Sequence, residues 1–119
     1  MIRIEFSRQT GPLIRSCSAH AEVCERGIRV ECSVAAVKTM LRLGATCIRV
    51  QDSWGADVEI VWNTDARRGG MTGHNCVRHT FSEELRLPPG TYTAVVTFYA
   101  KNGLGSDSVT VRTDAVTVV

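Results

Sequence analysis

The residues with the clearest chemical potential are a histidine and a cysteine, His20 and Cys32, which lie twelve positions apart. The apolar spacing that begins near residue 31 predicts a helix. Cys32 would open this helix, where the positive end of the helix dipole favours a thiolate over a thiol. His20 would end the preceding strand and, within reach of the thiol, would act as its base. The pair therefore predicts a nucleophilic cysteine activated by an imidazole.

Hydrophobic periodicity predicts the elements that would position this pair. Residues 1–7 and 13–19 alternate apolar and polar side chains, which is typical of an antiparallel hairpin. Residues 20–30 are polar and contain Gly27, so we expect a loop there. Residues 31–43 repeat apolar side chains at helical spacing, with a face wide enough to pack against a sheet and also against a second subunit.

The second half of the chain gives fewer firm signals. Residues 46–62 are rich in β-branched side chains on both sides of Gly55, which predicts a hairpin. Residues 63–82 predict a long loop, 91–109 fit either a helix or a β-hairpin, and 114–119 predict a final strand. The expected fold class is therefore α/β (α+β), with a mixed or antiparallel sheet of about five strands and one or two helices packed on it.

Size, charge and composition exclude several classes of protein. The 119 residues are expected to form one domain, 1–119. A formal charge of +2 is too small to indicate direct nucleic-acid binding. The N-terminal residues lack the apolar centre of a signal peptide, and no apolar run is long enough to cross a bilayer. We therefore expect a cytoplasmic protein without a membrane partner, whose five cysteines stay reduced.

Two short segments resemble the ribosomal-processing cysteine protease family, Prp. They are Ser-Ala-His-Ala at 18–21 and Glu-Arg-Gly at 25–27, followed by Cys32. Family members have a hairpin that ends in the histidine motif, a glycine-containing loop, and a helix that opens with the cysteine. The resemblance is specific over residues 1–44 and only positional afterwards.

The resemblance implies a cysteine endopeptidase with Cys32 as nucleophile and His20 as general base and acid. Gly27 and Arg29 would belong to a loop that gates the entry of substrate. Such an enzyme needs no cofactor and no metal. Its substrate would be the N-terminal segment of a large-subunit ribosomal protein, and it would form a homodimer.

The sequence departs from the family at positions that matter for this chemistry. Arg29 stands where the family has an aspartate thought to assist the catalytic pair, and Glu31 replaces an apolar residue. These changes predict impaired activity. Three carboxylates are candidates to orient His20 instead: Glu22, Glu25 and Asp52. The alternative is a catalytically degenerate, non-enzymatic module of the same fold that binds the ribosome or another protein.

Two other hypotheses follow from the residues alone. Zinc-type ligands occur as Cys17-x-x-His20-x-x-x-Cys24 and as His74-x-Cys76-x-x-His79, but neither group has the Cys-x-x-Cys spacing of a standard knuckle. Residues 45–119, if all are strands, also fit part of an immunoglobulin-like sandwich in a non-catalytic binding module. That hypothesis ranks below the protease because it leaves the helix over 31–43 unexplained.

Overall fold

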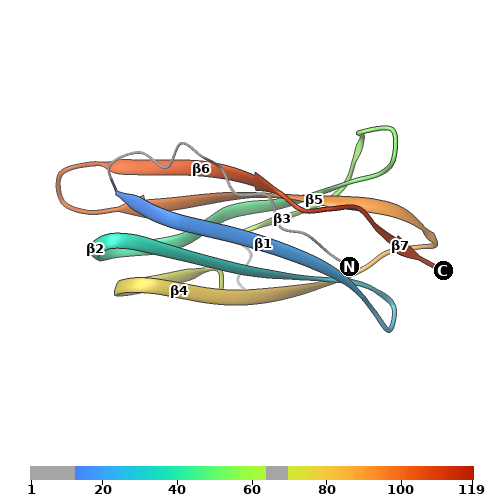
Figure 1. The fold of residues 1–119 in the computed structure, drawn as a ribbon, viewed down its shortest axis with the longest axis horizontal. Coiled ribbons are helices and arrows are strands. Elements are labelled where there is room, and N and C mark those ends of the chain that lie inside the picture. The colour runs from blue at the N-terminus through green and yellow to red at the C-terminus, as the bar shows by residue number, and fades with distance from the viewer. Residues whose placement is uncertain (1–12, 64–69) are drawn as a thin grey trace.

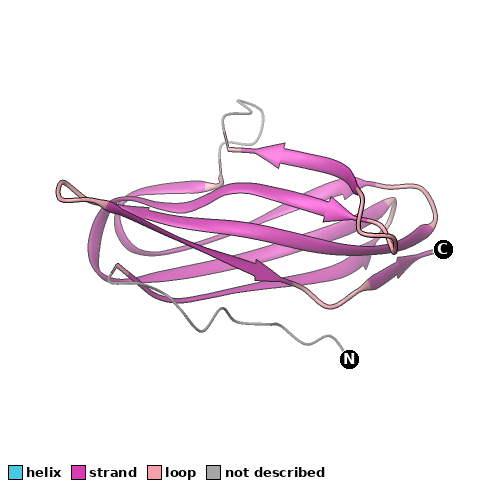
Figure 2. Cartoon of the chain, turned by 90° about the horizontal axis from the view of Figure 1, so that it is seen from above, coloured by secondary structure: helices cyan, strands magenta, loops and turns pink. Residues whose placement is uncertain are grey.

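The computed structural model describes residues 13–63 and 70–119, and every regular element in these ranges is a strand (Figures 1 and 2). The strands are β1 (Ile14–Cys24), β2 (Gly27–Gln51), β3 (Asp57–Trp62), β4 (Thr72–Arg86), β5 (Gly90–Lys101), β6 (Ser106–Arg112) and β7 (Val116–Val118). The predicted α/β fold is therefore wrong, because no helix packs on the sheet within 13–63 or 70–119. The strand expected over 1–7 lies outside the described residues.

β2 is the strand around which the others are arranged (Figure 1). Its first half lies between β1 and β4, and its second half pairs with β5 and β3. β5 pairs in turn with β6 and β7, and all of these pairings are antiparallel. The sheet curls until β1 meets β6, where the Asp107 carboxylate accepts hydrogen bonds from the Leu13 and Ile14 amides at 3.3 and 3.1 Å. The result is a curled antiparallel half-barrel.

The interior of the curled sheet holds the hydrophobic core. In the first half of β2 every second side chain points inward and is buried: Ile28, Val30, Cys32, Val34 and Ala36. The residues between them are more exposed, as expected for a strand with one face on a core. Phe98 of β5 is the largest fully buried side chain, and β1, β4 and β6 also contribute to the core.

The helix expected over 31–43 is absent, because these residues pair with β1, β4 and β5 as part of β2, and the helical spacing arises where the alternation along β2 is interrupted. Between Ala35 and Met40 the pairing with β4 shifts, and between Ala45 and Cys47 the pairing with β5 shifts. Each irregularity changes which residues face the core. The buried residues Ala36, Met40, Leu43 and Cys47 are consequently spaced by four, three and four positions, as on a helix. These four side chains are enclosed by the chain's own strands, so no helical face exists here, and association with a second subunit stays a prediction.

Local turn signals predicted the rest of the fold better. The hairpin over 46–62 is confirmed, and Gly55 in its turn has a φ of +84°. The ambiguous segment 91–109 is the β5–β6 hairpin, and the strand expected near the C-terminus is β7. The loop expected over 20–30 is wrong, because β1 and β2 extend across it with a turn at Glu25 and Arg26. The loop expected over 63–82 is wrong from residue 72 onward, where β4 begins, and its residues 64–69 lie outside the described ranges.

Candidate functional site

The strand register places the two predicted catalytic residues on opposite faces of the sheet. Cys32 pairs with Ala19 of β1, and both side chains point into the core. His20 pairs with Glu31 and points outward, with 27% of its side chain exposed. Cys32 and His20 belong to adjacent cross-strand pairs, and successive side chains of a strand alternate between faces. The two side chains therefore point to opposite faces. The structure therefore does not bring the imidazole to the thiol.

The surroundings of Cys32 also oppose a thiolate. Its side chain is only 3% exposed. Burial raises the pKa of the Cys32 thiol, and the nearby carboxylates of Glu83 and Glu31 raise it further. Cys32 lies in the middle of a strand, so it also lacks the helix dipole that the sequence prediction assumed. The thiol is protonated and behaves as a small core side chain.

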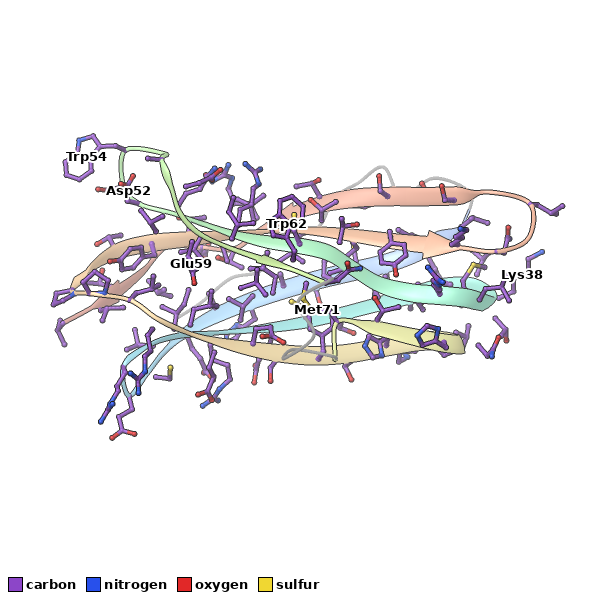
Figure 3. All side chains as sticks on the ribbon, turned by 180° about the vertical axis from the view of Figure 1, so that it is seen from behind. Lys38, Asp52, Trp54, Glu59, Trp62 and Met71 are labelled. Atoms are coloured by element: carbon purple, nitrogen blue, oxygen red, sulfur yellow. The ribbon has the colours of Figure 1, made fainter. Side chains whose placement is uncertain are left out.

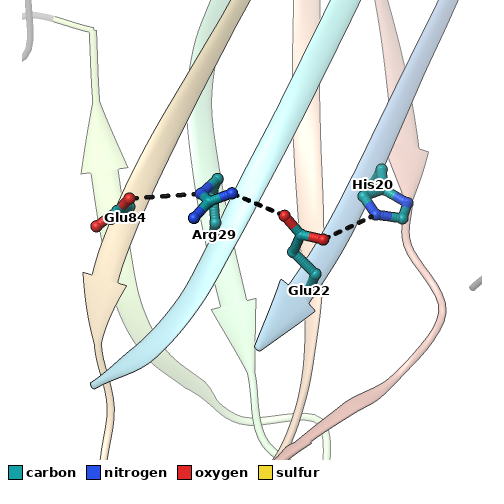
Figure 4. Close-up of polar contacts among 4 residues, drawn as sticks. All are labelled: His20, Glu22, Arg29 and Glu84. Carbon is teal, nitrogen blue, oxygen red and sulfur yellow. Dashed lines mark hydrogen bonds and ion pairs between the residues drawn. The ribbon is translucent and has the colours of Figure 1, made fainter. Parts of the chain in front are cut away.

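His20 belongs instead to a row of charged side chains that crosses three strands (Figure 4). Its Nε2 lies 3.8 Å from a Glu22 carboxylate oxygen, and Arg29 donates to Glu22 at 2.8 Å and to Glu84 at 3.4 Å. The hydrogen bond to Glu84 is the main cause that raises the pKa of Arg29. Of the three carboxylates considered as partners of His20, the structure places Glu22 beside it. The row links β1, β2 and β4 across the outer face.

Gly27, predicted to be a hinge of a gating loop, is a position of close packing. It is the first residue of β2, and an added Cβ would lie 1.9 Å from the Leu85 carbonyl oxygen. Only a residue without a side chain lets β4 approach this closely. Arg29 lies two residues further along the same strand, in the ion pairs described above. Neither residue is in a loop.

A shallow hollow of about 530 Å³ lies on the outer face next to this row. Its lining includes Ser18, Ser33, Thr80 and Ser82, together with Cys32 and Phe81. His20 and Glu31 also border it, but no hydrogen bond joins a hydroxyl to His20 among the residues described. The hollow thus offers polar contacts without an activated nucleophile.

Neither predicted zinc group forms a complete ligand set, although the Cys76 Sγ and the His79 Nδ1 both lie close to Gly73. Cys17 is buried in the core, whereas His20 faces outward three residues later. In the second group, the His79 Nε2 lies 2.6 Å from the Gly70 carbonyl oxygen and its ring stacks on Phe81. Within 13–63 and 70–119, no three His, Cys, Asp or Glu side chains are grouped so that they could hold a metal ion.

A surface that sequence reasoning missed lies at one end of the molecule. We call it the bend end and define it as residues 13–16, 36–42, 72–78 and 101–107. Lys38 lies there, far from Asp52 and Trp54 at the other end of the molecule (Figure 3). The bend end contains five basic side chains: Arg15, Lys38, Arg42, Arg78 and Lys101. Its one acidic residue, Asp107, is bonded to backbone amides of β1.

The strongest feature of the bend end is a row of three basic residues that lie opposite one another. Arg42 of β2 pairs with Lys101 of β5 on one side and with His74 of β4 on the other. Arg42 and Lys101 carry like charges, and like charges directly opposite on neighbouring strands destabilise a sheet. The ion pairs of His20, Arg29 and Arg49 all lie outside the bend end, and none of its five lysines and arginines forms one within the part of the chain described.

The sequence contained no signal for this cluster, because its residues come from four separate segments and the total charge is small. Only the register shows that positive charge is concentrated at one end. Comparisons of the chain with known protein families, with curated proteins and with solved structures find no match. No helix in the described ranges is long and apolar enough to cross a membrane. The argument for function therefore depends on the geometry of the sheet.

Proposed function

We propose that this chain is a non-catalytic binding module that docks through its bend end onto an anionic surface. The observation that carries the proposal is the cross-strand row Arg42, Lys101 and His74, which has no carboxylate partner within the described residues. An arrangement that costs stability in the free protein becomes favourable when an anion lies over it. The three side chains of the row are exposed, so an anionic partner can reach them.

The placement of His20 and Cys32 favours this proposal over the cysteine protease. Cysteine–histidine chemistry needs the two side chains within hydrogen-bond reach, and here they point away from each other across a sheet. Processing of a ribosomal protein remains a prediction from the resemblance. The helix expected over 31–43 is the objection to the immunoglobulin-like alternative, and the structure removes it because these residues belong to a strand.

We also propose that the protein acts in the cytoplasm. All five cysteines are free thiols, and three of them are buried in the core. Unpaired cysteines in this number are typical of proteins from a reducing compartment. A cytoplasmic module would meet anionic partners at physiological salt, where exposed charges interact over a range of about 8 Å.

The test measures binding to heparin as a soluble polyanion, for two double variants that each remove two positive charges. One carries Arg42→Gln and Lys101→Gln at the bend end. The matched control carries Arg26→Gln and Arg86→Gln, which lie by the β1–β2 turn together with Glu25 and Glu84. Both variants have the same net charge, so the comparison separates location from total charge.

The bend-end variant is expected to elute from heparin at lower salt and to lose about one unit of salt slope per removed contact. The control is expected to elute close to the wild type. Equal shifts for both variants would show that only net charge matters and would overturn the proposal. Circular dichroism of both variants confirms that the fold is retained.

A further inference from the structure

The bend end also exposes aliphatic side chains, which electrostatic docking alone does not explain. The proposed function leaves open which anionic surface is bound, and these side chains address that question. Leu104 is 94% exposed, and Val37, Leu41 and Val77 are each about half exposed, at 53%, 52% and 48%. They come from the β5–β6 turn, the irregular part of β2 and the start of β4. Exposed aliphatic groups gathered at one end indicate contact with an apolar phase or partner.

Leu104 is held outward by a well-defined turn. The Asn102 side-chain oxygen accepts hydrogen bonds from the Leu104 and Gly105 amides at 2.8 and 3.0 Å. The Asn102 amide in turn donates to the Gly105 carbonyl oxygen at 3.0 Å. These contacts fix the backbone on both sides of the leucine. The turn forms one tip of the bend end, beside the irregular part of β2 and the start of β4 (Figure 1).

The combination of side chains discriminates among anionic surfaces. Nucleic-acid strands are held by cations together with aromatic side chains on which bases stack. The bend end and its neighbouring β5 residues offer no tryptophan or phenylalanine on the surface, only the His74 ring and Tyr99, whose hydroxyl is bonded to Thr72 at 3.0 Å. Aliphatic tips surrounded by lysine and arginine instead match a lipid interface, which takes up apolar groups below the headgroups and attracts cations to anionic lipids.

We propose that the anionic surface is a lipid bilayer, on which the bend end docks peripherally. Leu104, Leu41 and Val37 enter the headgroup region, and the basic row of Arg42 and Lys101 lies over anionic headgroups. The lack of a spanning segment predicts no membrane partner, but peripheral docking does not need such a segment. A bilayer also accommodates side chains that project from separate turns, because lipids rearrange around each of them.

The test measures sedimentation of the full chain with phosphatidylcholine vesicles, with and without phosphatidylserine. Binding is expected only to vesicles that contain phosphatidylserine, and it weakens as salt rises. The Arg42→Gln, Lys101→Gln variant is expected to lose about fivefold in partition coefficient for each charge removed. Leu104→Ser is expected to lower the partition coefficient about tenfold, because a leucine side chain no longer enters the interface.

A matched pair of valines provides the control for the apolar contribution. Val37 lies at the bend end and Val23 near the β1–β2 turn, and they are 53% and 48% exposed. Val37→Ser is expected to weaken vesicle binding, whereas Val23→Ser is expected to leave it unchanged. Equal effects of the two substitutions would overturn the lipid assignment.

The heparin measurements distinguish failure of this inference from failure of the proposed function. Leu104→Ser is expected to bind heparin like the wild type, because the substitution removes no charge. If the wild type binds heparin through the bend end but does not sediment with phosphatidylserine vesicles, the lipid assignment is wrong and the electrostatic proposal stands. If the bend-end charge variant binds both probes normally, both proposals fail.

Discussion

Replacing Gly27 by alanine tests whether this residue is a hinge or a packing position. The hinge expected from the sequence would tolerate a methyl group, because a loop in solvent has room for it. In the structure an added Cβ at Gly27 lies 1.9 Å from the Leu85 carbonyl oxygen and 2.9 Å from the Leu87 amide nitrogen. Both neighbours are backbone atoms, so β4 itself must move.

The cost follows from what that movement breaks. The start of β2 pairs with β4 at Arg86, and next to it the Leu87 amide donates to the Arg26 carbonyl oxygen at 3.1 Å. Losing one or two backbone hydrogen bonds costs about 1 kcal/mol each, and residual overlap adds about 1–2 kcal/mol. We expect Gly27→Ala to lower the free energy of unfolding by about 2–4 kcal/mol. For a domain of this length that lowers Tm by roughly 8–16 °C.

Thermal and urea unfolding, followed by circular dichroism, measure this difference. Gly105→Ala is the matched control, because an added Cβ there meets no atom within 4 Å. We expect the control to stay within about 0.5 kcal/mol of the wild type. If the two variants unfold alike, β4 does not pack against Gly27 as described and the loop interpretation regains support.

Three further predictions concern the closure of the sheet and the buried thiols. Asp107→Ala removes the acceptor for the Leu13 and Ile14 amides, so the free energy of unfolding should fall by about 1–3 kcal/mol in urea titrations, and an unchanged value would refute the contact. Iodoacetamide should modify the partly exposed Cys24 and Cys76 before Cys32, and His20→Ala should leave the rate at Cys32 unchanged. Rapid modification of Cys32 that depends on His20 would support the protease instead. Burial raises the pKa of Cys17 from 9.0 to about 11 and also raises that of Cys32, so above pH 9 the unfolded thiols release protons that the folded ones keep. The free energy of unfolding should therefore fall as pH rises from 9 towards 11. Unfolding curves across that range should show a shallower decline for Cys17→Ala.

The hairpins were predictable because their signals are local. Gly55 supplies a positive φ in one turn, and the Asn-Gly step at 102–103 marks another, so each turn is specified by two to four neighbouring residues. The long strand β2 was not predictable in the same way. Its two register irregularities produce helical spacing in the sequence, and Ala35, Met40 and Leu41 are good helix formers. Pairing with β4 and β5 on both sides overrides that preference.

The candidate sites show the same distinction between local and long-range information. A separation of twelve positions placed His20 and Cys32 together only under the assumption of a strand, a loop and a helix. In a hairpin with its turn at 25 and 26, the same separation places them one register step apart and therefore on opposite faces. The basic row of the bend end joins residues 42, 74 and 101, and no local pattern relates these positions before the strands are paired.

The basic row allows one substitution whose effects on stability and on binding have opposite signs. Lys101→Glu replaces a repulsive pair with an attractive one opposite Arg42, which should stabilise the sheet by about 0.2–1 kcal/mol at low salt. The same change places a carboxylate in the surface proposed to meet anions, so binding to heparin should become weaker than in Lys101→Gln. Unfolding curves and heparin elution of both variants measure the two quantities independently. A variant that is more stable and binds less would show that the row lowers folding stability and contributes to binding. A variant that is more stable and binds equally well would show that the row has no part in binding.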